Sequence, residues 1–265
     1  MRKILKEHKE NFIKIFKLAR IDLIKTYRGS VMGCLWSIIK PIITIFAYWF
    51  TIEIGLRSGK MRSGYPNFLW LIASTVPWFY FSEMIVYGAT SIKNYSYLVT
   101  KMKFPISIIP TIVNLSKFIV HIVLIVIVVL LFRINGYKLD IYMLQVVFYM
   151  LMSFLFLEVW SIFSSMIGAI SKDFVNLVRS INILIFWLSG IIWDVNSISI
   201  NWVKQVLWFN PIAYLINGYR NCFINKVFFF EEPIQLLVFI GTLILLTILA
   251  VISHNKLRKE IADVL

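Results

Sequence analysis

Charged residues are scarce in this sequence: Asp, Glu, Lys and Arg make up 15% of its 265 residues, whereas hydrophobic residues make up 60%. A soluble domain cannot bury so much apolar surface, and the mean hydropathy is +0.81. Several separate runs of roughly 18 or more mostly apolar residues are long enough to cross a bilayer as helices. Because backbone polar groups in lipid must be satisfied within their own segment, the sequence predicts an all-α polytopic membrane protein with one membrane domain.

Acidic residues are few, 13 against 27 lysines and arginines, which leaves a formal net charge of +14. The basic residues gather at the ends of hydrophobic runs instead of forming a stripe with base-stacking aromatics. We therefore expect them to contact anionic lipid headgroups, and we expect no nucleic acid partner. Only two cysteines are present, and neither has a partner at metal or redox spacing. We expect no disulfide and no metal site.

The phosphate-binding motif G-x-x-x-x-G-K-[ST] does not occur in the sequence. We therefore expect no nucleotide site, no catalytic residue and no cofactor in this chain. Any ATP-driven process in which it takes part must draw its energy from a separate subunit.

The apolar runs predict six membrane-spanning helices within residues 31–265. They cover residues 35–56, 66–92, 106–132, 139–169, 175–193 and 234–252. In the preceding region, residues 1–30, Phe12, Phe16, Ala19 and Leu23 recur at helical spacing while the lysines lie largely elsewhere around the helix. This pattern is typical of a basic amphipathic helix in the membrane interface, with a soluble cap helix as the alternative.

The positions of the basic residues predict the orientation of the chain. Seventeen lie in residues 1–30 and in segments 93–105, 171–180 and 254–265, whereas eight lie in the alternate loops. The excess of positive charge on the cytoplasmic side places both termini in the cytoplasm.

Segment 93–105, KNYSYLVTKMKFP, is predicted to form a short cytoplasmic helix between the second and third spans. Pro105 fixes its exit, and Phe104 beside it is expected to be an exposed apolar side chain in a polar loop. Such a side chain, flanked by the cations Lys101 and Lys103, suits a groove on a partner protein. The alternative is a solvated loop whose lysines merely follow the charge rule.

Residues 194–226 are too aromatic for a solvated loop, yet FNPIAYLINGYR at 209–220 is too short to cross a bilayer. We predict two short re-entrant helices that dip into the outer leaflet and return. Asn210 is placed to cap the second helix, and Pro211 suits its first position. We expect wet hydroxyls on Tyr214 and Tyr219 at the outer interface. We expect Arg220 to reach outer headgroups or an anionic polymer, with a purely structural plug as the alternative.

Intramembrane acids and outer aromatic residues are further candidates for a transport pathway. Glu83 and Glu158 lie deepest in predicted spans, where an acid serves helix–helix hydrogen bonding, a polar pathway or proton coupling. Aromatic faces stack on sugar rings without demanding a fixed hydrogen-bond pattern, although an aromatic belt at the headgroup level is the simpler interpretation. Besides the two tyrosines, the aromatic candidates are Trp187, Trp193 and Trp208.

Several stretches resemble the membrane subunits of type-2 ABC exporters: GLRSGK after the first span, PWFYF at 77–81, KMKFPISIIPT at 101–111 and NPIAYLINGYR at 210–220. They are most similar to the permeases that translocate teichoic acid in Gram-positive bacteria. They also resemble the permeases that export lipid-linked O-antigen and capsular polysaccharide. Lys40 departs from the pattern, because a neutral residue is expected before Pro41.

The resemblance implies a homodimer with two copies of a cytoplasmic ATPase, which binds ATP and Mg, in a bacterial cytoplasmic membrane. Segment 93–105 is then the coupling helix that contacts the ATPase. The implied cargo is a lipid-diphosphate-linked polymer, with wall teichoic acid favoured and O-antigen or capsular polysaccharide as alternatives. Candidates to hold the diphosphate are the basic residues near the inner surface: Lys14, Lys17, Arg20, Lys25 and Lys40. The alternative functions are a drug efflux permease of the same fold and an ion-coupled secondary carrier.

Overall fold

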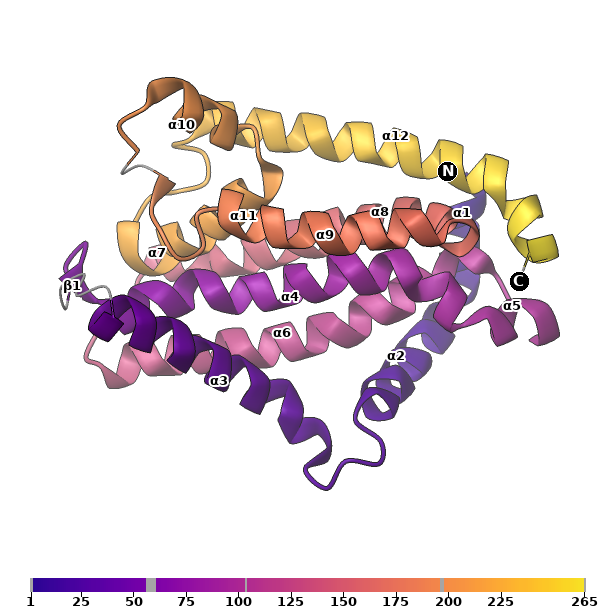
Figure 1. Cartoon of the computed structure of the whole chain (residues 1–265), viewed down its shortest axis with the longest axis horizontal. Helices are drawn as coiled ribbons and strands as arrows, with labels where there is room; N and C mark the ends of the chain where they lie inside the picture. The colour runs from indigo at the N-terminus through magenta and orange to yellow at the C-terminus, as the bar shows by residue number, and fades with distance from the viewer. Residues whose placement is uncertain (1, 56–60, 103, 196–197, 265) are drawn as a thin grey trace.

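Long helices running side by side form the body of the chain in the computed structural model, which describes residues 2–55, 61–102, 104–195 and 198–264 (Figure 1). The long helices are α3 (Trp36–Phe50), α4 (Asn67–Asn94), α6 (Ile109–Ile134), α8 (Val146–Ile170), α9 (Lys172–Leu188) and α12 (Pro233–Val264). This architecture confirms the all-α membrane class predicted from the apolar runs.

Within the described ranges, five helical stretches are long and apolar enough to cross a bilayer. They are Gly33–Gly55, Asn67–Met102, Ile108–Ile134, Ile141–Ile170 and Pro233–Ile261, and each overlaps a predicted span. The fifth predicted span, residues 175–193, falls on α9, which has 17 residues. The count of six spans therefore stays a prediction.

Helix α4 lies at the centre of the bundle, and most of its side chains are buried. It approaches α8 closely because glycines remove side chains from the contact. An added Cβ at Gly88 would lie 2.4 Å from Oγ of Ser161, and one at Gly168 would lie 2.0 Å from the carbonyl oxygen of Ala89. Small residues at helix contacts let backbones pack tightly in a membrane. The polar side chains of α4 are thereby held at fixed positions inside the bundle.

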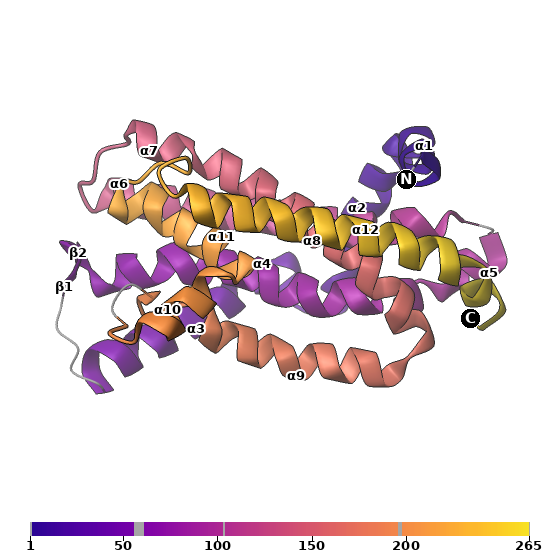
Figure 2. The same cartoon turned by 90° about the horizontal axis from the view of Figure 1, so that it is seen from above.

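The two ends of the bundle carry different short elements (Figures 1 and 2). The termini end holds α1 (Arg2–Glu10), α5 (Ser96–Met102) and the last turns of α12, and α2 (Phe12–Thr26) leads from it toward α3. The opposite, hairpin end carries two short antiparallel strands, β1 (Met61–Arg62) and β2 (Tyr65–Pro66). It also holds α7 (Ile141–Leu144), α10 (Asn201–Trp208) and α11 (Pro211–Arg220). The beginning and the end of the described chain therefore lie at the same end of the bundle.

The N-terminal region forms two helices instead of the single predicted one, because the chain breaks at Asn11 between α1 and α2. The side chains of the predicted apolar stripe differ in burial. Ala19 is buried with Ile15 against the start of α6, whereas Phe12 and Phe16 are 62% and 50% exposed. The small Ala19 lets α2 approach α6, and the exposed phenyl rings suit a helix that lies in the membrane interface.

Residues 194–226 contain two short helices, α10 and α11, as predicted, and α11 continues into a π-helical turn, Asn221–Asn225. The two helices differ in burial. Leu215 and Ile216 of α11 are completely buried, whereas Trp202 and Val206 of α10 are exposed. The hairpin end is therefore covered by one helix packed into the bundle and one helix on its surface.

Candidate functional site

The start of α11 carries the helix cap that the sequence predicts. The side-chain oxygen of Asn210 accepts hydrogen bonds from the backbone N–H groups of Ile212 (3.0 Å) and Ala213 (3.3 Å). Pro211 occupies the first helical position, as expected. The side-chain amide of Asn210 also donates to Oγ of Ser189, 3.0 Å away in the segment after α9. Asn210 thus satisfies the helix start and fixes α11 against the end of α9.

Replacing Asn210 with alanine is expected to lower the free energy of unfolding by about 1 kcal/mol, the typical effect of losing a helix cap. Asn210→Asp keeps the acceptor oxygen and is the matched control. Thermal unfolding of the purified protein in detergent, followed by far-UV circular dichroism, measures the difference. Equal melting temperatures for the alanine and aspartate variants would show that the cap does not stabilise the fold.

Arg220 lies inside the bundle, with its side chain 2% exposed. Its guanidinium donates to the carbonyl oxygens of Gly190 (2.6 Å) and Ile191 (2.5 Å) in the segment after α9. It also donates to Oγ of Ser74 in α4 (2.8 Å), and its Cζ lies 3.7 Å from the ring centroid of Trp70. The expectation that Arg220 reaches outer headgroups or a polymer is wrong, because buried acceptors take up its hydrogen-bond donors.

Tyr214 and Tyr219 also face the interior, so the prediction of wet hydroxyls at the outer interface is wrong. Both side chains are buried. The hydroxyl of Tyr219 lies 2.8 Å from Nε2 of His121 in α6 and 3.4 Å from Oγ of Ser153 in α8. The physical reason is that α11 packs into the bundle with these two rings in its core. They contribute to holding α11 against its neighbours.

Glu158 of α8 is held by hydrogen bonds that cross the bundle. Thr111 donates to its Oε1 at 2.5 Å and Asn114 donates to its Oε2 at 2.8 Å, both from α6. The side-chain oxygen of Asn114 accepts in turn from the hydroxyl of Tyr80 in α4, at 2.5 Å. The acid therefore connects three helices by polar contacts, which is the first of the roles that an intramembrane acid can serve.

Glu83 of α4 forms an ion pair with Lys117 of α6, with 2.9 Å between Oε2 and Nζ. The Lys117 side chain is 6% exposed and the Glu83 side chain 45% exposed. Lys117 also lies over the ring of Tyr87. Sequence reasoning missed Lys117, although a lysine well inside the third predicted span was a signal that could have found it.

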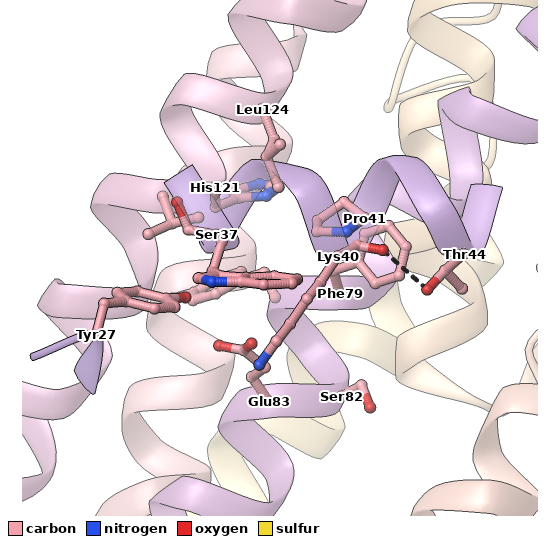
Figure 3. Close-up of a pocket in the computed structure, with 13 residues that line it drawn as sticks. Tyr27, Ser37, Lys40, Pro41, Thr44, Phe79, Ser82, Glu83, His121 and Leu124 are labelled. Atoms are coloured by element: carbon pink, nitrogen blue, oxygen red, sulfur yellow. Dashed lines mark hydrogen bonds between the residues drawn. The ribbon is translucent and has the colours of Figure 1, made fainter. Parts of the chain in front are cut away.

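The Glu83–Lys117 ion pair lies between two cavities beside the α2–α3 turn, α4 and α6, and these two cavities are together called the lysine crevice. Glu83, Lys40 and Tyr27 line a cavity of about 130 Å³, and Lys117 and Lys25 line one of about 200 Å³. Figure 3 shows Tyr27, Lys40 and Glu83 pointing into the first cavity from the turn, from α3 and from α4. The crevice thus collects charged side chains from four different segments.

The lysine crevice has an excess of positive charge. It contains Lys25, Lys40 and Lys117, with Glu83 and Asp22 as its two carboxylates. The Asp22 carboxylate already accepts a hydrogen bond from the hydroxyl of Tyr95. Burial, aided by the charge of Glu83, raises the pKa of Tyr27, so its hydroxyl remains a hydrogen-bond donor. Ammonium and hydroxyl donors together are suited to an anionic oxygen-rich group such as a phosphate.

The five basic residues predicted to hold a diphosphate separate into two groups. Two of them, Lys25 and Lys40, line the lysine crevice. The other three lie exposed along α2: Lys14, Lys17 and Arg20. The structure therefore places Lys40 in the same cavity as Glu83 and Lys25 in the same cavity as Lys117.

The three candidate tryptophans of the hairpin end occupy different positions. Trp187 of α9 is 53% exposed and lines a cavity of about 610 Å³ between α3, α4 and α9. Nε1 of Trp193 donates to the carbonyl oxygen of Trp187 at 2.9 Å, and Nζ of Lys204 lies over the ring of Trp208. Trp187 is thus well placed to contact a molecule that enters between these helices.

Phe104 is not the exposed apolar side chain that the sequence predicts. It is half-buried and packs in a cluster with Ile15 and Ala19 of α2. That prediction is wrong because the apolar face of α2 lies close enough to cover the phenyl ring. The exposed apolar side chains of the segment are instead Met102 (65%) and Tyr97 (46%) of α5.

The remaining residues of the predicted coupling segment flank this packed phenylalanine. Lys101 is exposed in the last turn of α5, and Pro105 precedes the short 3-10 helix η3 (Ile106–Ile108) that opens α6. Lys103 lies outside the described residues. The exposed surface of this segment therefore combines Met102, Tyr97 and Lys101.

The fold and these sites define an integral membrane protein. The chain belongs to the ABC-2 type transporter family, whose model matches residues 14–224. It is similar to the O-antigen export system permease protein RfbA of Myxococcus xanthus, with 22% identity over 265 residues and 94% of each chain covered. It is also similar to two proteins of the same name from Klebsiella pneumoniae, with 26% identity over 256 residues and 25% over 248, covering 92% of each chain.

Proposed function

We propose that this chain is the transmembrane subunit of an ATP-driven exporter for a lipid-diphosphate-linked polysaccharide in a bacterial cytoplasmic membrane. The O-antigen export role in the names of its relatives supports polysaccharide as the cargo class. These names favour the O-antigen alternative over wall teichoic acid. The observation that carries the proposal is the lysine crevice beside the interfacial helix α2.

The chemistry of the lysine crevice suits the head of such a cargo. A diphosphate presents several anionic oxygens, which form strong charge-assisted hydrogen bonds with ammonium groups. Lys25 and Lys40 are exposed, whereas Lys117 is nearly buried and already oriented by Glu83. In this arrangement Lys25 and Lys40 contact the diphosphate first, and Lys117 contributes positive potential from behind. The lipid tail then lies along the apolar outer surface of α3, where Ile42 and Phe46 are exposed.

The same proposal accounts for the two ends of the bundle. The termini end faces the cytoplasm, in agreement with the excess of basic residues in its segments. There α5 contacts a separate ATPase subunit, which supplies the nucleotide site through ATP and Mg. Two copies of the chain and two copies of the ATPase form the transporter, and the hairpin end lies at the exit on the outer side.

Inverted membrane vesicles test the proposed function. They contain the chain, the ATPase that co-purifies with it and a radiolabelled lipid-linked polysaccharide, and transport is measured as protection of the sugar from an added glycosidase. We expect protection to require ATP and to persist when a protonophore is present. Protection that needs an ion gradient but no ATP would instead identify a secondary carrier, and no protection under either condition would exclude the cargo.

Removing both exposed lysines of the crevice, Lys25→Gln with Lys40→Gln, is expected to lower the initial export rate about tenfold or more. A charge-assisted hydrogen bond contributes about 1.5 to 3 kcal/mol, and 1.4 kcal/mol corresponds to a factor of ten. The matched control is Lys14→Gln with Lys17→Gln on the exposed face of α2, for which we expect less than a twofold change. Equal rates for the two double variants would show that the crevice does not bind the cargo.

A further inference from the structure

The first helix, α1, is fastened to the rest of the chain at the termini end by Glu7. The Glu7 carboxylate forms an ion pair with Arg258 near the end of α12, with 2.9 Å between Oε1 and Nη1. Its other oxygen accepts a hydrogen bond from the hydroxyl of Ser107 in η3. Only 12% of the Glu7 side chain is exposed. One carboxylate therefore joins α1 to two elements that are far apart in the sequence.

His8 makes a second attachment. Its Nδ1 lies 2.8 Å from the carbonyl oxygen of Ile4 in the same helix. Its Nε2 lies 2.7 Å from Oγ1 of Thr111, the hydroxyl that donates to Glu158. The ring thus links α1 to α6 and, through Thr111, to the buried acid of α8. The residues that make these contacts are together called the α1 clasp: Glu7, His8, Ser107, Thr111, Glu158 and Arg258.

The α1 clasp lies beside the segment expected to contact the ATPase. Ser107 comes three residues after Phe104, whose ring packs on α2. On the other side, Val99 of α5 packs against a buried cluster that contains Ile106 of η3 and Ile261 of α12. The contacts of α5 and of the clasp therefore meet at η3 and at the end of α12.

The second helix continues this connection to the lysine crevice. Asp22 of α2 accepts a hydrogen bond from the hydroxyl of Tyr95, the residue between α4 and α5. Nζ of Lys25 lies 4.9 Å from the ring centroid of Tyr95 and 5.7 Å from that of Tyr97 in α5. Tyr95 and Tyr97 thus bring the α5 segment into direct contact with a lysine of the crevice, so that a displacement of α5 reaches this lysine.

We propose that Glu7 and His8 are positioning residues for export. The α1 clasp holds α1, α6, α8 and α12 together at the termini end, so that movement of α5 reaches Lys25 of the lysine crevice instead of undocking α1. This role rests on the proposed function. Glu7 and Arg258 both lie outside the residues matched by the family model, which begin at 14 and end at 224. The clasp therefore joins two parts of the chain that flank the matched region.

A charge exchange between Glu7 and Arg258 tests the clasp in the complete transporter. We expect Glu7→Arg alone to lower the amount exported per ATP hydrolysed about tenfold, a typical coupling effect, while ATPase co-purification and ATP hydrolysis stay within twofold of wild type. The double variant Glu7→Arg with Arg258→Glu restores the pair and should return this ratio to within about twofold. The matched control is Lys6→Glu with Glu10→Lys, which exchanges an exposed pair on the same helix.

Maleimide labelling of a cysteine at position 4 measures the docking of α1 without cargo or ATPase. Ile4 is nearly buried, and Cys34, which is exposed, is first replaced by serine. We expect slow labelling of Ile4→Cys in the otherwise wild-type chain and in the double variant, and labelling about tenfold faster with Glu7→Arg. Glu7→Gln, which loses the charge but keeps an acceptor for Ser107, should lie between them. If the Glu7→Arg variant does not fold, the Glu7→Gln variant is used for the comparison instead.

These measurements separate the possible failures. Equal labelling of all variants would show that Glu7 does not hold α1. Fast labelling with unchanged export per ATP would show that α1 undocks without consequence, and a double variant as defective as the single one would exclude the ion pair as the cause. A wrong cargo assignment instead abolishes export already in the wild type and leaves the labelling pattern intact.

Discussion

Replacing Arg220 with methionine is expected to remove most of the folded protein, because the guanidinium donates to five backbone and side-chain acceptors inside the bundle. Without it, the carbonyl oxygens of Gly190 and Ile191 lose their short hydrogen bonds, and the contact with the Trp70 ring is lost. Leaving a buried hydrogen-bond acceptor without its donor typically costs about 1 to 3 kcal/mol for each group, and several acceptors are affected together. That is a large part of a total stability of about 5 to 15 kcal/mol.

The yield of monodisperse protein after detergent extraction, measured by size-exclusion chromatography, checks this expectation. Arg220→Lys keeps the charge but not the planar set of donors and should give an intermediate yield. Lys204→Met, which removes a cation that lies over Trp208 on the exposed helix α10, should give a normal yield. A stable Arg220→Met protein with slow export would contradict the structural role and favour a contact with the cargo at the exit.

Replacing Met102 with aspartate is expected to abolish export by separating the chain from its ATPase. Met102 is 65% exposed at the end of α5, beside the exposed Lys101, and it presents an apolar side chain to a partner. A central apolar contact of an interface contributes about 2 kcal/mol or more, which corresponds to a loss of affinity of about thirtyfold. We therefore expect the amount of co-purified ATPase and the export rate both to fall by at least about tenfold.

Co-purification from membranes and the melting temperature of the isolated chain are measured together. The melting temperature should stay unchanged, because the side chain at position 102 is exposed. Leu139→Asp places the same charge on an exposed leucine at the hairpin end and should leave the ATPase bound. Phe104→Asp should behave differently from Met102→Asp, since it opens the packing on α2 and lowers the melting temperature as well. Full retention of the ATPase by Met102→Asp would exclude α5 as the contact.

Features that depend only on residues close together in the sequence could be predicted from the sequence. The apolar runs located five spanning helices because length and hydropathy are properties of one continuous segment. The cap of α11 was predictable for the same reason, since Asn210 satisfies N–H groups two and three residues further along the chain. The break at Asn11 was not predictable, because both α1 and α2 continue the same helical pattern.

The surroundings of individual side chains could not be predicted in this way. The position of Arg220 near a predicted interface suggests a cation that reaches headgroups. Its acceptors, however, come from Gly190, Ile191 and Ser74, which are far away in the sequence. The sequence predicts an exposed Phe104, because the α2 residues that cover it precede it by about 90 positions. In both cases a distant segment supplied the contact that determines the position of the side chain.

The sequence by itself determined that the chain crosses a membrane as helices, where those helices lie and how α11 begins, because hydropathy and capping act over short stretches of chain. The tertiary structure alone decided which charges meet. It paired Glu83 with Lys117, placed Lys25 and Lys40 on either side of that pair, and left Lys14, Lys17 and Arg20 outside. The reason is that a side chain deep in a helix bundle must find its partner on a neighbouring helix, and only the packing of the helices decides which neighbour that is.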